Sequence, residues 1–257
     1  MVAQRHADLC RHRCGRHSIL TLRLNRVITE KLRLGWSPEM VSHTVHCAPH
    51  TIYRWIYQRK IDFQLTQLFN HSEHRKRKQD LRSHYNQLVG TSIDERSESA
   101  NRRAEKGRLE IDTIRSGRGA KAALLPVVDR ATCLLATTKL DNLSQSAGLK
   151  DFSRLIADFP GPVRTVTVDH GKGFPCDQAL TKRYGIPVYF CHAYHPNERG
   201  TNERFNRELR YYFPKGIKFD RISETTVQYM ADLINNKPRK CLHWQTPLQA
   251  VSMPLSR

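Results

Sequence analysis

Apolar side chains recur at helical spacing from Leu20 to Leu34, and Gly35 then ends the segment. A second helix begins directly after it, because Ser37 suits the N-cap and Pro38 the first helical position. The turn HCAPH and the run TIYRWIYQR then predict a third helix. Two helices joined by so short a turn are typical of a helix-turn-helix.

The third helix has the composition of a recognition helix, with polar residues at its start and an apolar back. We expect its DNA-facing side chains to be His50, Thr51 and Arg54, and its packed side chains to be Ile52, Trp55 and Ile56. An ordinary helical hairpin is the alternative. The pattern therefore predicts a helical domain at residues 20–70, preceded by a basic arm at residues 1–19.

Residues 71–106 are polar and nearly free of large apolar side chains, so we expect a linker there. A basic cluster lies within it, and the phosphate backbone of DNA is a natural partner for such a cluster between two DNA-binding domains. Its members are Arg75, Lys76, Arg77 and Lys78. A solvated charge run is the alternative.

Past residue 106 the pattern becomes that of a sheet. RLEIDTI, AALLPVVD and TCLLATTKL predict three sequential antiparallel strands, and VRTVTVD and IPVYFC predict two more. Helices are expected at 144–158, over CDQALTKRYG, and at about 200–212, 223–236 and 247–252. Strands in a meander followed by alternating helices and strands predict an α/β domain at 107–257, a mixed five-stranded sheet flanked by helices in the ribonuclease-H-like order.

The charge of the chain indicates a polyanionic partner. Its 43 Lys and Arg residues against 24 Asp and Glu residues give a formal net charge of +19, which favours nucleic acid. No run of 18 apolar residues occurs, and the polar start lacks the apolar centre of a signal peptide. We therefore expect a cytoplasmic protein without a membrane partner.

The seven cysteines are scattered, and most lie in apolar runs, as reduced packing residues do. One N-terminal group has the ligand types of a zinc site, although its spacing matches no closed four-ligand pattern. Its members are His6, Cys10, His12, Cys14 and His17. A basic arm that contacts phosphates is the alternative.

Three carboxylates occur where a site would form: Asp112 in the first strand, Asp169 at the end of VRTVTVD, and Glu203 near the start of a helix. Each also has a local explanation, such as capping a turn or pairing with a neighbouring arginine. Together they suit phosphodiester cleavage and transfer, which uses two divalent cations, Mg²⁺ or Mn²⁺, held by carboxylate oxygens. Helical spacing puts Asn206 and Arg210 on the face of Glu203, so Arg210 is a candidate phosphate contact.

Several motifs resemble those of one family. The runs LRLGWSPEM with HTIYRWIY, LEIDTI, TVTVDHGKGF, HPNERGTNERFNRELRYYFPKG and NNKPRKCLHWQTPLQA look like a bacterial DDE transposase of the group named for insertion sequence thirty. The catalytic core of that group is similar to retroviral integrases. The likeness covers about residues 30–252, and the spacing from Asp169 to Glu203 agrees with that group.

The resemblance implies that Asp112, Asp169 and Glu203 form a metal-binding catalytic triad, around which Gly171, Asn202, Asn206 and Arg210 shape the site. It also implies cleavage at the ends of a mobile element and transfer of the freed 3′ hydroxyl into target DNA. The implied partners are double-stranded DNA, as terminal repeats and target, and further copies of the chain in a homo-oligomer.

The chain departs from the group's usual pattern near all three carboxylates and at the N-terminus, where a further helix-turn-helix is usual. The differing residues are Arg108, Leu109, Ile111, Gly173, Asn197 and Glu198. These departures leave three alternatives open: a truncated or inactive copy that only binds DNA, a nuclease that only hydrolyses, and a structural nucleoid protein. A metal-dependent joining assay distinguishes them.

Overall fold

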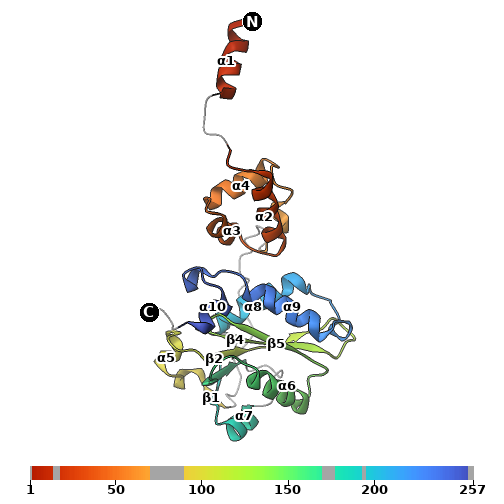
Figure 1. Ribbon diagram of the computed structural model, residues 1–257. Coiled ribbons are helices and arrows are strands. Elements are labelled where there is room, and N and C mark those ends of the chain that lie inside the picture. The colour runs from red at the N-terminus through yellow and green to blue at the C-terminus, as the bar shows by residue number, and fades with distance from the viewer. Residues whose placement is uncertain (1, 14–17, 70–89, 170–176, 193–194, 254–257) are drawn as a thin grey trace. The chain divides into compact units, whose positions relative to one another are not determined.

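A computed structural model describes residues 2–13, 18–69, 90–169, 177–192 and 195–253 (Figure 1). The chain divides into two compact units, Met1–Ser72 and Glu73–Arg257. None of the helices in the described part of the chain combines the length and apolar character that crossing a membrane requires.

The first unit is helical. Its elements are α1 (Val2–Arg13), α2 (Leu22–Arg33), α3 (Pro38–Val45), α4 (Pro49–Tyr57) and the short 3-10 helix η1 (Leu65–Gln67). The Ser37 hydroxyl caps α3 by accepting a hydrogen bond from the Met40 amide at 3.3 Å, as the sequence predicts. Gly35, at φ +70°, supplies the left-handed turn between α2 and α3.

A single apolar cluster holds α2, α3 and α4 together. The predicted back face of α4 is confirmed, because Ile52, Trp55 and Ile56 are all buried in this cluster. Ile28 and Leu32 of α2 complete its centre at 0% and 1% exposure. The unit therefore has a core of its own, formed from residues between Leu20 and Leu68.

The second unit contains a seven-stranded mixed sheet within the described residues. Its strands are β1 (Thr91–Ser92), β2 (Arg108–Ile111), β3 (Ile114–Arg115), β4 (Ala123–Asp129), β5 (Leu135–Leu140), β6 (Thr165–Val168) and β7 (Val188–Phe190). β4 pairs antiparallel with β2, β3 and β5, whereas β6 pairs parallel with β2 and β7. This order, an antiparallel set around β4 followed by the parallel strands β6 and β7, confirms the predicted ribonuclease-H-like sheet. The sheet has seven strands where five were predicted, because β1 was not foreseen and the predicted strand RLEIDTI is divided into β2 and β3.

Helices cover both faces of the sheet (Figure 1). In chain order they are α5 (Glu98–Asn101), α6 (Gln145–Ala157), α7 (Asp177–Tyr184), α8 (Gly200–Tyr212), α9 (Glu224–Asn235) and α10 (Pro247–Ser252), with the 3-10 turns η2 (Ile93–Glu95), η3 (Pro196–Arg199), η4 (Phe219–Arg221) and η5 (Lys240–Leu242). α6 and α7 lie on one side, and α8, α9 and α10 lie on the other. The bounds of α8 and α10 agree with the expected 200–212 and 247–252.

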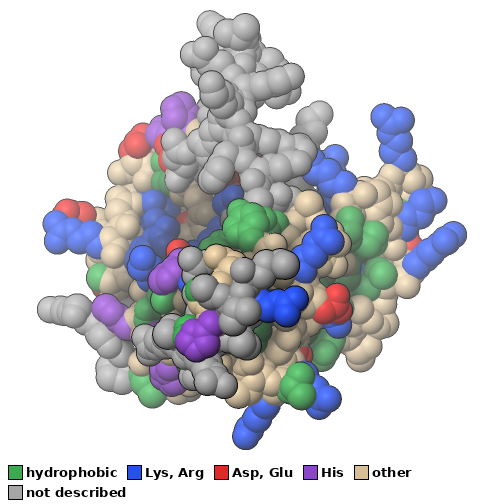
Figure 2. All heavy atoms as spheres, turned by 90° about the horizontal axis from the view of Figure 1, so that it is seen from above, with side chains coloured by type: hydrophobic (Ala, Val, Ile, Leu, Met, Phe, Trp, Pro, Cys, Tyr) green, Lys and Arg blue, Asp and Glu red, His purple; other side chains and the backbone are tan. Residues whose placement is uncertain are grey.

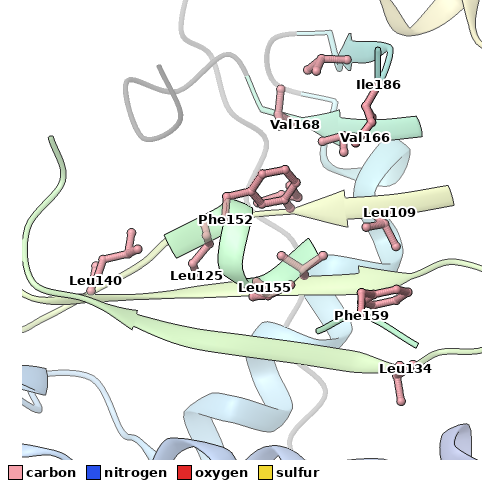
Figure 3. Packing of buried hydrophobic residues seen from close by; sticks show 14 of the residues in the cluster. Leu109, Leu125, Leu134, Leu140, Phe152, Leu155, Phe159, Val166, Val168 and Ile186 are labelled. Carbon is pink, nitrogen blue, oxygen red and sulfur yellow. The ribbon is translucent and has the colours of Figure 1, made fainter. Parts of the chain in front are cut away.

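Two apolar clusters pack the helices against the sheet, one on each face. On the α6 side, Phe152, Leu155 and Phe159 pack against Leu109, Leu125 and Val166 of the sheet (Figure 3). On the other side, Phe205 and Leu209 of α8 join Val227 and Ile234 of α9 against Leu124 and Val128. β4 is buried along its whole length, because both clusters draw residues from it.

The structure differs from the prediction at residues 91–106, which we expected to belong to the linker. Thr91 and Ser92 form the edge strand β1 beside β7, and Ile93 and Ala100 are buried at 6% and 0% exposure. We did not predict a strand here because the segment is mostly polar, and Ile93 and Ala100 are its buried apolar residues. The rest of the expected linker, including the Arg75–Lys78 cluster, lies outside the described residues.

Candidate active site

Asp112 and Asp169 are neighbours across the centre of the sheet. β2 and β6 are parallel, with Glu110 opposite Thr167. Asp112 and Asp169 each follow two residues later, so the same register brings them opposite one another where both strands end. Ligand sites gather at this end of parallel strands.

A proline interrupts the ladder at Asp112. β2 and β3 share one register along β4, with a gap at Asp112 and Thr113. Within that gap the Asp112 amide still donates to the Pro126 carbonyl at 3.2 Å, but proline has no N–H with which to return a bond. The Thr113 amide donates instead to the Asp112 carboxylate at 2.8 Å, which orients that side chain.

One guanidinium joins the two aspartates. Arg199 Nη2 donates to Asp169 Oδ2 at 2.6 Å, and Arg199 Nη1 lies 3.4 Å from Asp112 Oδ2. The Arg199 side chain is 13% exposed, against 27% for Asp112 and 45% for Asp169. Arg199 immediately precedes α8, so this bridge also ties the start of that helix to the ends of β2 and β6.

The start of α8 is fixed by a carboxylate from the sheet. The N-cap residue Arg199 makes no side-chain capping bond, but Glu110 Oε2 accepts a hydrogen bond from the Asn202 amide in the first turn at 2.9 Å. The other oxygen of Glu110 lies 2.9 Å from Arg130 Nε, an ion pair whose two atoms are not aligned as a hydrogen bond. Glu110 is 1% exposed, so it is a buried, charge-paired cap.

α8 carries the third predicted carboxylate, Glu203. Glu203 lies in its first turn, one turn before Asn206, whose Nδ2 donates to Asp112 Oδ2 at 2.7 Å. Asn206 Oδ1 is buried and has no hydrogen-bond partner among the residues that the structure describes. Among the described residues, no group of three or more His, Cys, Asp or Glu side chains is arranged so that it could hold a metal ion.

Known proteins similar to this chain are transposases. It is 32% identical over 263 residues to the transposase for insertion sequence element IS4351 of Bacteroides fragilis, covering 96% of this chain and 78% of that one. It is 30% identical over 248 residues to the transposase for IS1086 of Cupriavidus metallidurans, with 90% and 72% covered. The transposase InsI for IS30C of Escherichia coli is 29% identical over 251 residues, with 90% and 64% covered. No family model matches the chain.

The chain belongs to the insertion-sequence transposases of the IS30 group.

Two further residues predicted to contact DNA in this transposase have other contacts in the structure. Arg210 donates to the backbone carbonyl of Arg115 at 3.0 Å, which holds β3 against α8. Burial lowers the pKa of the Arg210 guanidinium. Asn202 is 1% exposed, and its side-chain amide has no hydrogen-bond partner. A DNA contact by either side chain stays a prediction.

The helical unit of the transposase exposes the polar side chains of α4. His50 and Arg54 are exposed, and Thr51, one helical turn before the buried Trp55, is half-buried. Figure 2 shows Lys and Arg side chains over much of the face drawn, with only scattered Asp and Glu. In the predicted zinc cluster, Cys10 Sγ lies 3.7 Å from a ring nitrogen of His6, whereas Cys14 and His17 lie outside the described residues.

Glu198, unexpected in so basic a motif, organises the loop before α8. Its carboxylate accepts a hydrogen bond from the His192 amide at 2.7 Å and lies 2.7 Å from Nδ1 of the same histidine. Asp94 of η2 lies 3.0 Å from His192 Nε2. The hydrogen bond and charge of Glu198, followed by the charge of Asp94, raise the pKa of His192. The imidazole of His192 therefore links η2, which follows the edge strand β1, to η3, which precedes α8.

A buried ionic cluster fixes the middle of α8. Glu208 forms an ion pair with the fully buried Arg239, and Lys237 Nζ lies 3.4 Å from Glu208 Oε2. Burial alone would raise the pKa of Glu208, but attraction to Arg239 and Lys237 outweighs it and lowers that pKa. The segment NNKPRKCLHW thus closes onto the helix that carries Glu203.

Sequence reasoning did not assign roles to Glu110 and Arg199. Their partners lie about 90 and 30 positions away along the chain, so no local pattern marks the contacts. One signal was present: Glu110 is a carboxylate between the apolar residues Leu109 and Ile111 of a predicted strand.

Proposed function

We propose that this transposase binds the ends of an insertion sequence and catalyses DNA strand cleavage and strand transfer at Asp112, Asp169 and Glu203. The observation that carries the proposal is the Arg199 bridge. A single guanidinium contacts Asp112 and Asp169, so the two carboxylates lie within one cation's reach at adjacent strand ends. α8, which carries Glu203, is capped by Glu110 from the same strand as Asp112.

The side chains of the site suit a hard divalent cation, Mg²⁺ or Mn²⁺. Asp112, Asp169 and Glu203 would hold it through carboxylate oxygens, the ligands that both ions accept. Asn206 supports the fit, because its amide oxygen is buried without a hydrogen-bond partner beside the Asp112 carboxylate. When bound, such ions lower the pKa of an attacking water or hydroxyl and stabilise the leaving oxygen, most effectively as a pair.

The chemistry needs no covalent bond to the protein. In cleavage, a water oxygen bonds to phosphorus as the bond to the 3′ oxygen breaks, and the freed 3′ oxygen takes up a proton. In transfer, that 3′ hydroxyl attacks a target phosphodiester in line and releases the target's own 3′ oxygen. Asp112, Asp169 and Glu203 would hold the cations that orient the reacting phosphate, and neighbouring arginines would offset its charge.

The helical unit would bind DNA, and the positive net charge of the chain would strengthen that binding. His50, Thr51 and Arg54 would read bases as a helix-turn-helix, because α4 exposes His50 and Arg54, leaves Thr51 half-buried, and buries its apolar face. The Arg75–Lys78 cluster would contact phosphates. Joining two element ends calls for more than one catalytic unit, so the working form is a homo-oligomer in the bacterial cytoplasm at the nucleoid.

The test is strand transfer of a labelled element-end duplex into a plasmid, with Mg²⁺ or Mn²⁺. We expect joined product from the native chain and none from Asp169→Asn. Cleavage without joining would assign a hydrolytic nuclease, and binding without either reaction would assign an inactive copy. Joining by the Asp169→Asn variant would refute the assigned carboxylates.

Arg54→Ala tests the helix-turn-helix separately. We expect it to weaken binding to the element end by roughly 1–3 kcal/mol while leaving binding to unrelated duplexes nearly unchanged. Competition gel shifts with both duplexes measure this. An equal loss on both would make Arg54 a phosphate contact, not a base-reading residue.

A further inference from the structure

Arg199 occupies the position between the carboxylates that a bound cation would also need. Its guanidinium is 2.6 Å from Asp169 Oδ2 and 3.4 Å from Asp112 Oδ2. Those oxygens are the ones that the two aspartates would offer to a metal. The guanidinium and the metal would therefore compete, because a cation bridging the two carboxylates would need the space between them that the guanidinium fills, and two positive charges so close repel one another.

The backbone on both sides of Arg199 is held independently of the bridge. On the N-terminal side, Glu198 accepts from the His192 amide at 2.7 Å. On the C-terminal side, the Asn202 amide is bound by Glu110 at 2.9 Å. The guanidinium can therefore leave the aspartates by rotation of its own side chain, without moving α8. Arg199 Nη1 has no aligned hydrogen bond, so the contact to Asp112 is the weaker of the two.

We infer that Arg199 is an internal counter-cation: it holds Asp112 and Asp169 together before metal binds, and it swings away when a divalent cation takes its place. This inference rests on the proposed function, because it needs the same carboxylates to bind metal. Arg199 thus positions the ligands and sets the metal concentration at which the site fills. Without it, two carboxylates would face one another uncompensated in a partly buried site.

The inference predicts opposite effects of Arg199→Gln on two properties of the DNA-free protein. The variant should melt at a lower temperature than the native chain in EDTA, because the aspartates repel one another. It should bind Mn²⁺ roughly three- to tenfold more tightly, because no guanidinium competes for the oxygens. Thermal unfolding and Mn²⁺ titration, by calorimetry and by the electron paramagnetic resonance of free Mn²⁺, measure these properties without any turnover.

Arg207→Gln is the matched control. Arg207 is exposed on the same helix, so its removal changes the net charge equally but leaves the bridge intact. We expect that variant to bind Mn²⁺ as the native chain does. A rise in affinity of the same size in both variants would mean that general charge, and not the bridge, controls binding, and would overturn the inference.

The remaining outcomes are separable. If the native chain binds Mn²⁺ and Arg199→Gln binds it equally or more weakly, the counter-cation role is wrong while the proposed metal site stands. If the native chain and both variants bind no Mn²⁺, the proposed metal-dependent function fails as well. If Arg199→Gln no longer unfolds cooperatively, Arg199→Lys replaces it in the Mn²⁺ titration. A lysine cannot contact both aspartates through two arms, so an Mn²⁺ affinity unchanged from the native value would overturn the inference.

Discussion

Two buried carboxylates of the sheet unit, Glu110 and Glu208, each pair with a buried arginine. Glu110 is 1% exposed and serves both Arg130 and the first turn of α8. Replacing it with alanine would leave the Arg130 guanidinium and the Asn202 amide without that partner. We expect Glu110→Ala to lower the free energy of unfolding by about 3–5 kcal/mol in urea denaturation. The control is Glu105→Ala, whose pair with Arg108 is half-exposed and should matter far less. Equal losses would contradict the capping role.

At the same scale, Cys241 is an exposed thiol whose Sγ lies 3.8 Å from that of the buried Cys133. The contact with Cys133, followed by the charges of Arg204 and Arg239, lowers the pKa of Cys241 to about 6 against the effect of burial. Alkylation of Cys241 by iodoacetamide, followed by peptide mass spectrometry, should therefore rise with pH around that value and level off near neutrality. Cys133→Ala, which removes the hydrogen-bond donor, should move the rise to higher pH. A native rise confined to pH above about 8 would contradict this assignment.

At the scale of elements, the position of α8 depends on contacts of the residues just before the helix as well as on contacts of its first turn. His192 lies between Glu198 and Asp94, which join the connection before α8 to η2. The raised pKa of His192 means that folding favours its protonated form. This contribution to stability is fully present below the unfolded pKa of about 6.5 and is lost as pH rises through the folded pKa.

The difference in unfolding free energy between the native chain and His192→Gln should therefore be largest near pH 5.5 and shrink toward pH 8.5. Denaturation curves at several pH values measure it. Asp94→Asn, which removes one facing carboxylate, should flatten the pH dependence of the native chain. A difference that stays constant across this range would show that the histidine contributes by packing and not by charge.

At the scale of the whole molecule, the two units have separate hydrophobic cores. The core of the helical unit contains Trp55 at 2% exposure and draws on no residue of the sheet. Trp55→Ala should remove about 3–5 kcal/mol, enough to unfold so small a domain. We expect loss of selective DNA binding while the main melting transition, that of the sheet unit, is retained. Tyr57→Ala, at a residue 71% exposed, is the control. Loss of both transitions in Trp55→Ala would show that the units fold as one.

The sequence by itself determined where most elements form, because helical and alternating patterns depend on near neighbours. The caps Ser37 and Pro38, the bounds of α8, and the strands β4 and β6 all follow from such local signals. The mixed sheet and its order also follow, since chain order and strand type leave few compact arrangements. β1 was missed because its sequence is polar, and only its pairing with β7 makes it a strand.

Only the tertiary structure decided which charges meet. The Arg199 bridge, the Glu110 cap and the Glu208 cluster join residues about 30 to 90 positions apart. The first two depend on the register of β2 and β6, and the third depends on how the segment after α9 packs against α8. A lone carboxylate looks the same in sequence whether it binds a cation, caps a helix or faces water. Distance and burial separate these roles, because the energy of a charge depends on its neighbours and on its access to solvent.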